Sequence, residues 1–241
     1  MTKYLKHFLF QTGMGLLVIL ICAPAWADWD QWRQAIKNRD EGSAYREVLQ
    51  MAQQGDSKAK YIVGYYLNYG IGVVRNPAKG EEWIKQITDD DKASGMNKLA
   101  YNWAVNSQYL DAALILVREA LVIKPDNPYY LDTLAWVFYQ QEHYEEALNP
   151  SCRSVRALPQ DAEVRIHLAQ IYFQLGLYEE AKNEGLTAID LLAKSNPSDY
   201  FFDFNQWRAE LQEMMGQADK ELRLQTLPLN LLIQSCFNLI S

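Results

Sequence analysis

The feature that most constrains this chain is a repeat of 34 residues. Ala113, Ala147 and Ala181 recur at that spacing, and other columns follow it within residues 95–194. A period of this length is typical of stacked helix-turn-helix units, because one unit can bury its apolar face only against its neighbours. The other columns are Ala100, Leu134 and Leu168; Tyr101, Ala135 and Ala169; Ala104, Phe138 and Tyr172; Leu110, Tyr144 and Tyr178; and Ala120, Ser154 and Ala188.

The pattern resembles the tetratricopeptide repeat, which has small residues where two helices cross, aromatics between them and a proline after the second helix. Alanine lets helix axes approach closely. Pro125 and Pro159 close two units, because proline cannot continue a helix. The third unit has Ala193 there, and Pro197 could end its helix instead. The resemblance implies an all-α fold, a right-handed α-solenoid of antiparallel helix pairs, with three units in residues 95–194.

The middle unit contains a proline inside its expected second helix. The dipeptide Asn149-Pro150 lies there, and an interior proline removes a backbone hydrogen bond at a cost of roughly 3 kcal/mol. The sequence therefore predicts a kink or a late helix start between Ala147 and Ser151.

A second motif precedes these units. Residues 59–73 read Ala-Lys-Tyr-Ile-Val-Gly-Tyr-Tyr-Leu-Asn-Tyr-Gly-Ile-Gly-Val, and Trp83 follows. This stretch resembles a Sel-one-like repeat, also a helix pair, in which Trp83 packs over the tyrosines. Gly64 then allows close helix contact, while Gly70 and Gly72 permit the left-handed backbone of a tight loop.

Three further details of this region affect its interpretation. Glycine-rich loops also cradle phosphate, but Gly70-x-Gly72 lacks the longer nucleotide fingerprints and follows no expected strand. Gly80 stands where the family usually has alanine, which is expected to weaken its helix by roughly 1 kcal/mol. The acids at 89–91 could bind a cation, although three adjacent acids on a turn are more often a solvated helix cap.

Residues 28–94 are therefore interpreted as capping helices followed by the Sel-one-like repeat. Two short helices are expected in residues 28–55, the first capped by Asp28 or Asp30 and the second running over residues 43–54. Trp29 and Trp32 are expected to close the open end of the array by packing, with ligand stacking as the alternative.

The first 27 residues have the features of a secretory signal peptide. Lys3 and Lys6 precede a largely apolar stretch, and Ala25-Trp26-Ala27 offers a cleavage site before Asp28. The alternative interpretation of this segment is an uncleaved membrane anchor, which would need roughly 20 continuous apolar residues. The short leader resembles bacterial ones, so we expect a mature periplasmic protein.

Composition excludes several classes of partner. Losing Lys3 and Lys6 and no acid would move the formal charge from -7 to -9. Such a chain lacks the electrostatic footprint for nucleic acid or anionic lipid, so its partners are expected to be neutral or basic. His143 and His167 are in no metal-ligand spacing with cysteine or acid. We expect no cofactor, no metal and no enzymatic activity.

The mature chain would keep two cysteines, Cys152 and Cys236. In an oxidising compartment they could form a disulfide, or they could be two buried thiols that never meet.

The resemblance also places a peptide-binding groove on the first helix of each unit. Aromatic rings beside amides suit an extended peptide, because rings give contact area and amides satisfy its backbone. Trp136 and Phe173 could instead be core residues. The groove positions are Lys98, Asn102, Val105 and Asn106 in the first unit, Tyr129, Asp132, Trp136, Tyr139 and Gln140 in the second, and Glu163, Ile166, Gln170, Phe173 and Gln174 in the third.

One subfamily holds a peptide's free C-terminus in a carboxylate clamp. Lys98 and Asn102 match two of its positions, whereas Thr133, Glu163 and His167 depart from the others. A generic peptide groove is therefore favoured over a clamp.

Residues 195–241 are expected to hold capping helices and an apolar tail. A helix through about Met215, broken at Gly216, would cover the last unit. Beyond Arg223 the tail has no charge and is short for a bilayer crossing. It could pack on the array, mediate self-association, bind a partner or touch a membrane surface.

Together these features predict a non-enzymatic scaffold or adaptor of the bacterial envelope that binds a protein or peptide of unknown identity. The alternative is a cell-wall-associated module that binds peptidoglycan stem peptides.

Overall fold

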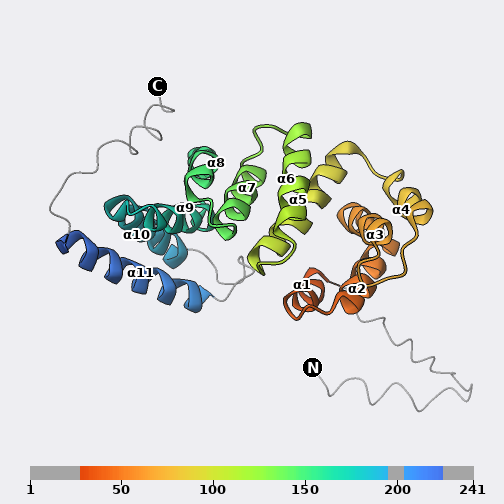
Figure 1. Ribbon diagram of the computed structural model, residues 1–241, viewed down its shortest axis with the longest axis horizontal. Coiled ribbons are helices and arrows are strands. Elements are labelled where there is room, and N and C mark those ends of the chain that lie inside the picture. Colours follow the sequence, from red (N-terminus) through yellow and green to blue (C-terminus); the bar gives the residue numbers. More distant parts are fainter. Residues whose placement is uncertain (1–27, 195–203, 225–241) are drawn as a thin grey trace, which may run out of the picture.

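A computed structural model describes residues 28–194 and 204–224, and these ranges contain eleven α-helices and no strand. The helices follow one another as a curved row of packed pairs (Figure 1). This is the all-α solenoid of antiparallel helix pairs predicted from the period. The helices are α1 (Trp29–Lys37), α2 (Glu41–Gln53), α3 (Ser57–Tyr69), α4 (Pro77–Ile84), α5 (Asp89–Val105), α6 (Leu110–Ile123), α7 (Pro128–Gln140), α8 (Tyr144–Ala157), α9 (Ala162–Gln174), α10 (Tyr178–Lys194) and α11 (Phe204–Leu224).

The 34-residue period marks equivalent places in three helix pairs. The second helix of each pair begins at Leu110, Tyr144 or Tyr178. Ala113, Ala147 and Ala181 lie one turn further on and are fully buried. A larger side chain at these positions would hold the paired helices apart.

Local signals set most of the helix ends in this region. Pro125 and Pro159 each follow the residue that ends α6 or α8, while Asn127 and Asp161 cap the next helix by accepting backbone N–H groups. Without a proline at position 193, α10 has 17 residues, whereas α6 and α8 have 14. Pro197 lies outside the described residues.

The glycines of the Sel-one-like segment act as predicted. Gly70 ends α3 with φ 77° and Gly72 has φ 63°, both in the left-handed region. Gly64 faces α4 so closely that a Cβ there would lie 2.9 Å from the carbonyl oxygen of Gly80. Trp83 packs into the same apolar cluster as the tyrosines of α3.

Gly80 needs a different explanation from the one predicted. A Cβ at this position would lie 2.7 Å from the carbonyl oxygen of Gly64. The backbones of α3 and α4 therefore cross where both chains have glycine. Gly80 allows this contact, so its cost in helix propensity is only one part of its effect.

Asp28 caps α1, as predicted, by accepting the N–H of Gln31 at 2.8 Å. The side chain of Trp32 is fully buried, with Trp29 edge-on against it at 5.2 Å between ring centroids. Both tryptophans pack at this end of the array, and α2 begins at Glu41, slightly before the predicted start.

The late start predicted for α8 is wrong, because this helix runs from Tyr144 through the buried Pro150 to Ala157; the kink stays a prediction. The predicted break at Gly216 is wrong too. Helix α11 continues through Gly216, where a glycine costs roughly 1 kcal/mol without ending the helix. At the junction before α5, Thr88 is the capping residue, and the three acids 89–91 form the first helical turn.

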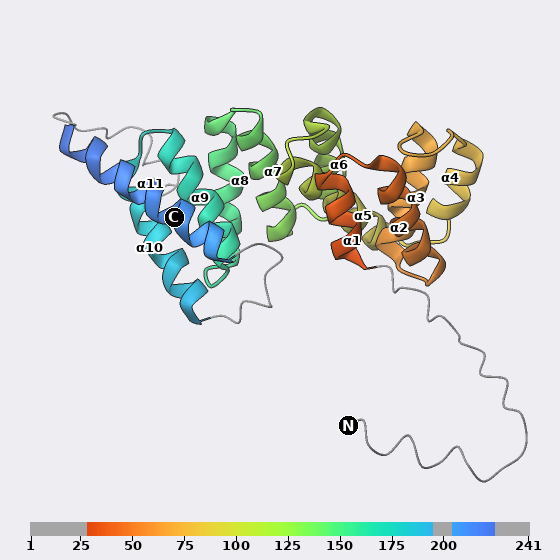
Figure 2. The same ribbon diagram turned by 90° about the horizontal axis from the view of Figure 1, so that it is seen from below.

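Helix α11 extends the array. It packs against α10 and α9 in the way that α9 packs against α8 and α7. It lies alongside both helices in the two views (Figures 1 and 2). In position it is the first helix of a fourth unit, although the sequence has no repeat register there.

Several predictions fall outside the described residues, namely the leader (1–27), the segment 195–203 and the apolar tail (225–241). Cys236 also lies outside the described residues. Its pairing with Cys152 stays a prediction. No helix in the described ranges has both the length and the hydrophobicity that a bilayer crossing needs.

Candidate functional site: the inner face of the array

The predicted groove residues lie on α5, α7 and α9, which are neighbours in the array, and α11 continues the row. We call the surface formed by these four helices the inner face. Its beginning, middle and end differ in burial and charge.

At the beginning, Lys98 packs on the N-terminal helices. Its Nζ atom lies 4.2 Å from the ring centroid of Trp29, within cation–π distance. Burial, together with the nearby Arg33 and Lys58, lowers the pKa of Lys98 to about 8. Three basic side chains, Lys98, Arg33 and Lys58, therefore lie near one another at this end of the inner face.

Three predicted amides are already bonded within the protein. The buried Asn102 donates from Nδ2 to the Lys98 carbonyl at 2.8 Å, and Asn106 donates to the Asn102 carbonyl at 2.7 Å. Gln140 accepts from the Ser107 hydroxyl at 2.8 Å. A ligand would have to displace these bonds to use the amides. Of the other predicted positions, Val105 and Tyr129 are exposed and Ile166 is buried.

The middle of the inner face has a buried ion pair. Nδ1 of His167 lies 2.9 and 3.0 Å from the two carboxylate oxygens of Asp132. Asp132 is 5% exposed and His167 is 1% exposed. Trp136 stacks on the His167 ring at 4.1 Å between centroids and on Tyr139 at 4.7 Å. Asp132 and Trp136 therefore hold α7 against α9.

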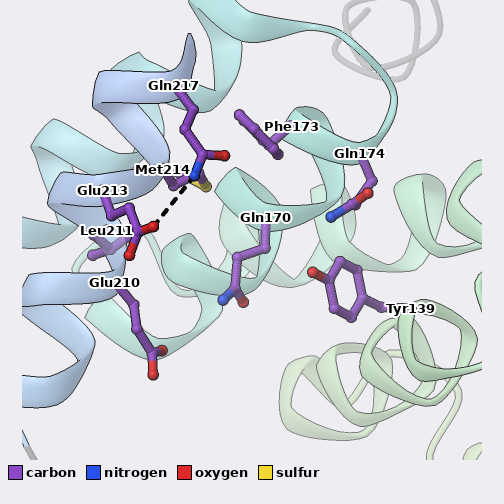
Figure 3. A pocket seen from close by; sticks show the side chains of 9 residues that line it. All are labelled: Tyr139, Gln170, Phe173, Gln174, Glu210, Leu211, Glu213, Met214 and Gln217. Carbon is purple, nitrogen blue, oxygen red and sulfur yellow. Dashed lines mark hydrogen bonds between the residues drawn. The ribbon is translucent and has the colours of Figure 1, made fainter.

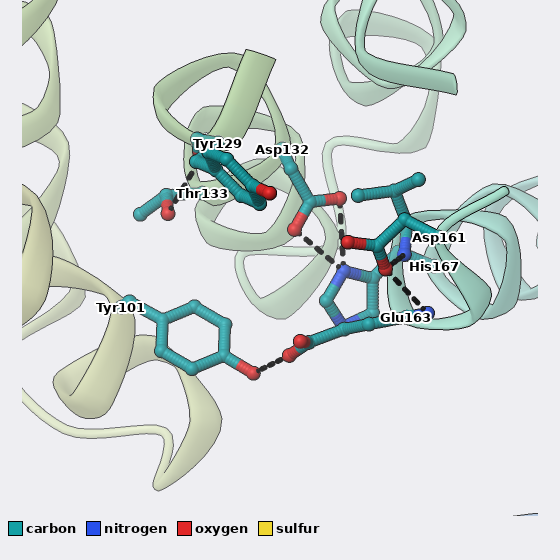
Figure 4. A network of polar contacts seen from close by, with 8 residues as sticks. Tyr101, Tyr129, Asp132, Thr133, Asp161, Glu163 and His167 are labelled. Atoms are coloured by element: carbon teal, nitrogen blue, oxygen red, sulfur yellow. Dashed lines mark hydrogen bonds and ion pairs between the residues drawn. The ribbon is translucent and has the colours of Figure 1, made fainter. Parts of the chain in front are cut away.

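Further acids join this pair in a polar network (Figure 4). The hydroxyl of Tyr101 on α5 donates to Oε1 of Glu163 on α9. Asp161, the cap of α9, accepts the backbone N–H of Glu163 at 2.9 Å. The network thus joins three successive first helices. Glu163 and His167 are two of the positions where the sequence departs from the carboxylate clamp.

The network favours bound protons. Burial opposes a charged His167, but the carboxylates of Asp132, Glu163 and Asp161 outweigh it and raise the pKa of the ring. Burial raises the pKa of Glu163 to about 7, and Asp132 adds to this, although His167 acts in the opposite direction. Burial also raises the pKa of Asp161, against the backbone bonds that it accepts.

The arrangement does not match a metal centre. Within the described residues, no group of three or more His, Cys, Asp or Glu side chains is placed to hold a metal ion. The network contains two bonded pairs, Asp132 with His167 and Tyr101 with Glu163, and each pair includes one residue of α9. It can hold helices together and set the local charge.

The end of the inner face has a pocket of about 200 Å³ between α7, α9 and α11 (Figure 3). Four predicted groove residues line it from α7 and α9. The opposite wall comes from α11. The predicted residues are Tyr139, Gln170, Phe173 and Gln174, and the α11 residues are Glu210, Leu211, Glu213, Met214 and Gln217.

The structure therefore gathers one subset of the predicted residues. The four pocket residues come together, whereas Lys98, Asn102 and Asn106 lie towards the other end of the row. The α11 wall was missed as part of a site. The apolar spacing of this helix is that of an amphipathic helix, with Leu211, Met214 and Ala218 on one face, and it indicates packing. The spacing does not indicate that the helix also forms one wall of a pocket.

Residues 106–184 match the model of a family described as "Anaphase-promoting complex, cyclosome, subunit 3". This family has tetratricopeptide-like repeats. The match covers α6 to α9 and the beginning of α10, and it supports the repeat interpretation for that part of the chain. No curated protein sequence matches the chain.

Among solved structures, "MamA MSR-1 C2" is 20% identical, with 69% of this chain and 95% of that chain covered and a TM-score of 0.43. "Crystal structure of MamA protein" is 14% identical, with 72% and 93% covered and a TM-score of 0.43. A Sel1 repeat protein from Oxalobacter formigenes is 16% identical, with 78% and 86% covered and a TM-score of 0.34. At these identities and TM-scores, the likenesses say nothing about function.

Tetratricopeptide-like repeats generally mediate interactions between proteins and are typically not catalytic. Their stacking produces an extended concave surface, which is the part that partners contact. The pocket and the network lie on the corresponding helices of this chain.

Proposed function

We propose that this chain is a non-enzymatic scaffold of the bacterial envelope that binds an extended peptide segment of a partner protein along its inner face. The observation that carries the proposal is the pocket between α7, α9 and α11. It is the place where rings, amides and apolar side chains from three helices meet around an open volume.

The chemistry of this pocket suits a peptide. Tyr139 and Phe173 supply ring surface that loses little conformational entropy on binding. Gln170, Gln174 and Gln217 each have a donor and an acceptor, so they can satisfy the backbone groups of an extended segment. Such a site anchors a partner through a few buried side chains.

Affinity capture from an envelope extract tests this proposal. The bait is compared with a pocket variant, Phe173→Ala with Gln174→Ala, and with a control on the exposed face of α6, Ile115→Ala with Glu119→Ala. We expect one envelope protein to bind the unchanged chain and the control and to be lost with the pocket variant. Circular dichroism establishes that all three baits are folded.

Two results would contradict the proposal. If all three baits retain the same proteins, the pocket is not the binding site. If the unchanged chain retains no envelope protein and instead sediments with insoluble wall material, it is a wall-associated module that binds stem peptides.

The envelope location rests on the leader and has its own test. We expect the N-terminus of the protein purified from its host to be Asp28, and osmotic shock to release the protein with the periplasmic fraction. An intact N-terminus that stays with the membrane fraction would indicate an uncleaved anchor.

A further inference from the structure

The pocket has the size of one amino-acid side chain. Its volume of about 200 Å³ lies below the roughly 300 Å³ at which sites for drug-sized molecules begin. One long side chain of a bound peptide fits this volume better than a cofactor.

The charge of the lining selects among side chains. Glu210 and Glu213 line the pocket, and no lysine, arginine or histidine does. Oε1 of Glu210 accepts from Gln206 Nε2 at 2.8 Å, and Oε1 of Glu213 accepts from Gln217 Nε2 at 3.4 Å. Neither carboxylate forms an ion pair with any described residue. Both carboxylates are exposed to solvent, and the described residues that donate hydrogen bonds to them are neutral amides.

The remaining walls suit the stem of a basic side chain. Leu211, Met214 and Phe173 provide apolar surface for methylene groups, and the ring of Tyr139 can face a cation. Oε1 of Gln170 is buried and has no hydrogen-bond partner. Figure 3 shows this side chain between the α11 wall and Tyr139. It is an acceptor available to an N–H donor that enters the pocket.

We propose that the pocket is a subsite for a lysine or arginine side chain of the bound peptide. This inference rests on the proposed function, because it names the residue type that the groove accepts. The aliphatic stem packs between Leu211, Met214 and Phe173, and the charged group lies between Glu210 and Glu213. Charge-assisted bonds to the two carboxylates then favour a basic residue over a neutral one of similar length.

Methyl NMR of the methionines in the full chain tests this. The probes are four acetylated, amidated tripeptides with Arg, Lys, Gln or Glu between two alanines. We expect the two basic peptides to shift the Met214 methyl signal saturably at millimolar concentration. The Met96 methyl, on α5 outside the pocket, should stay in place.

A charge-matched pair of variants locates the effect. Glu210→Gln with Glu213→Gln removes both pocket charges, whereas Glu145→Gln with Glu146→Gln removes two exposed charges from α8. We expect the first variant to bind the arginine peptide about tenfold more weakly at low salt and the second to bind it normally. Equal thermal midpoints establish that neither variant is unfolded.

The results distinguish two failures. If the glutamine peptide binds as well as the arginine peptide, or if the pocket variant keeps its affinity, the pocket binds peptides without charge selection, and only this inference is wrong. If no peptide moves the Met214 methyl, the pocket is not a peptide site, and the proposed function fails with it.

Discussion

Helices α1 to α6 bury one apolar cluster that reaches into α7, whereas α7 to α11 distribute theirs between two smaller clusters. The first cluster includes the fully buried Trp32 and Trp103. Burying a large apolar side chain stabilises a fold by roughly 1.5–3 kcal/mol. The N-terminal half is therefore stabilised mainly by one continuous apolar core.

Glycine shows the same contrast. A Cβ on Gly64, Gly80 or Gly95 would lie within 3.0 Å of a neighbouring helix, so backbones approach closely in the N-terminal half. In the other half, a Cβ on Gly185 would lie 3.3 Å from the Met215 side chain, and one on Gly176 or Gly216 would contact nothing within 4 Å. Close backbone contact fixes how helices cross, and its absence leaves that task to side chains.

In the C-terminal half, buried polar side chains help to fix how the helices pack. Of six buried polar residues among those described, five lie on α7 to α9 and one, Asn102, on α5. They include the Asp132–His167 pair, which Trp136 links to the pocket residue Tyr139 by stacking on both His167 and Tyr139. Buried charges stabilise less than apolar packing, but they specify one arrangement and set the local potential. One repeat geometry thus relies on apolar burial and close backbone contact in one half and on buried polar side chains in the other.

The largest effect is expected from removing the buried carboxylate. Asp132→Ala leaves His167 without its partner, so we expect the free energy of unfolding to fall by about 3 kcal/mol at pH 6. The raised pKa of His167 gives the sign of the pH dependence. Stabilisation by the pair is complete below the unfolded pKa, roughly 6.5, and is lost as the pH rises through the higher folded pKa. Urea denaturation at pH 6 and pH 9 should show the larger loss at pH 6.

Asp126→Ala is the matched control, because it removes an acid that pairs with Arg153 at the surface. Such pairs contribute at most about 1 kcal/mol. If both variants lose the same free energy, the buried network contributes no more than a surface ion pair, and the contrast between the halves fails.

An intermediate effect is expected at the crossing of α3 and α4. Gly80→Ala improves helix propensity but places a Cβ against the Gly64 carbonyl, so we expect a loss of about 2 kcal/mol. Gly42→Ala on α2 meets only ordinary contacts beyond 3.5 Å and should be neutral or stabilising by up to about 1 kcal/mol. A Gly80→Ala chain that is more stable in urea than the unchanged one would mean that this crossing has room for a methyl group.

The sequence was informative about the fold because each unit repeats the same local signals. The alanine columns and prolines predicted the positions of α6 to α10, and the glycines predicted the loop after α3. It failed where a residue of low helix propensity lies inside a longer helix. Helix α8 continues through the buried Pro150, and α11 continues through Gly216. The pattern predicted weakness at both positions, but one such residue does not end a helix.

The candidate site was predictable only in part. The repeat register assigned Tyr139, Gln170, Phe173 and Gln174 to one surface, and the structure gathers them in one pocket. Burial of Asp132 depends on the position of His167, which is 35 residues away in another unit. The α11 wall could not be predicted, because that helix has no repeat register. A periodic pattern cannot specify which side chains of different repeat units contact one another.

The smallest effect concerns the protonation of Glu163. Burial is the main cause that raises the pKa of this carboxyl to about 7. The stability that the protonated group contributes is therefore complete below its unfolded pKa and is lost as the pH rises through about 7. The side chain in Glu163→Gln is neutral at every pH, so we expect this variant to be as stable as the unchanged chain near pH 5. At pH 8 we expect it to be more stable by about 1 kcal/mol, because His167 compensates only part of the buried charge of Glu163. Thermal denaturation from pH 5 to pH 8 measures the difference. Glu145→Gln, also in a first helical turn but exposed, should give a curve parallel to that of the unchanged chain. If the Glu163→Gln curve is parallel too, Glu163 ionises in the folded protein at low cost, and the buried network does not favour bound protons.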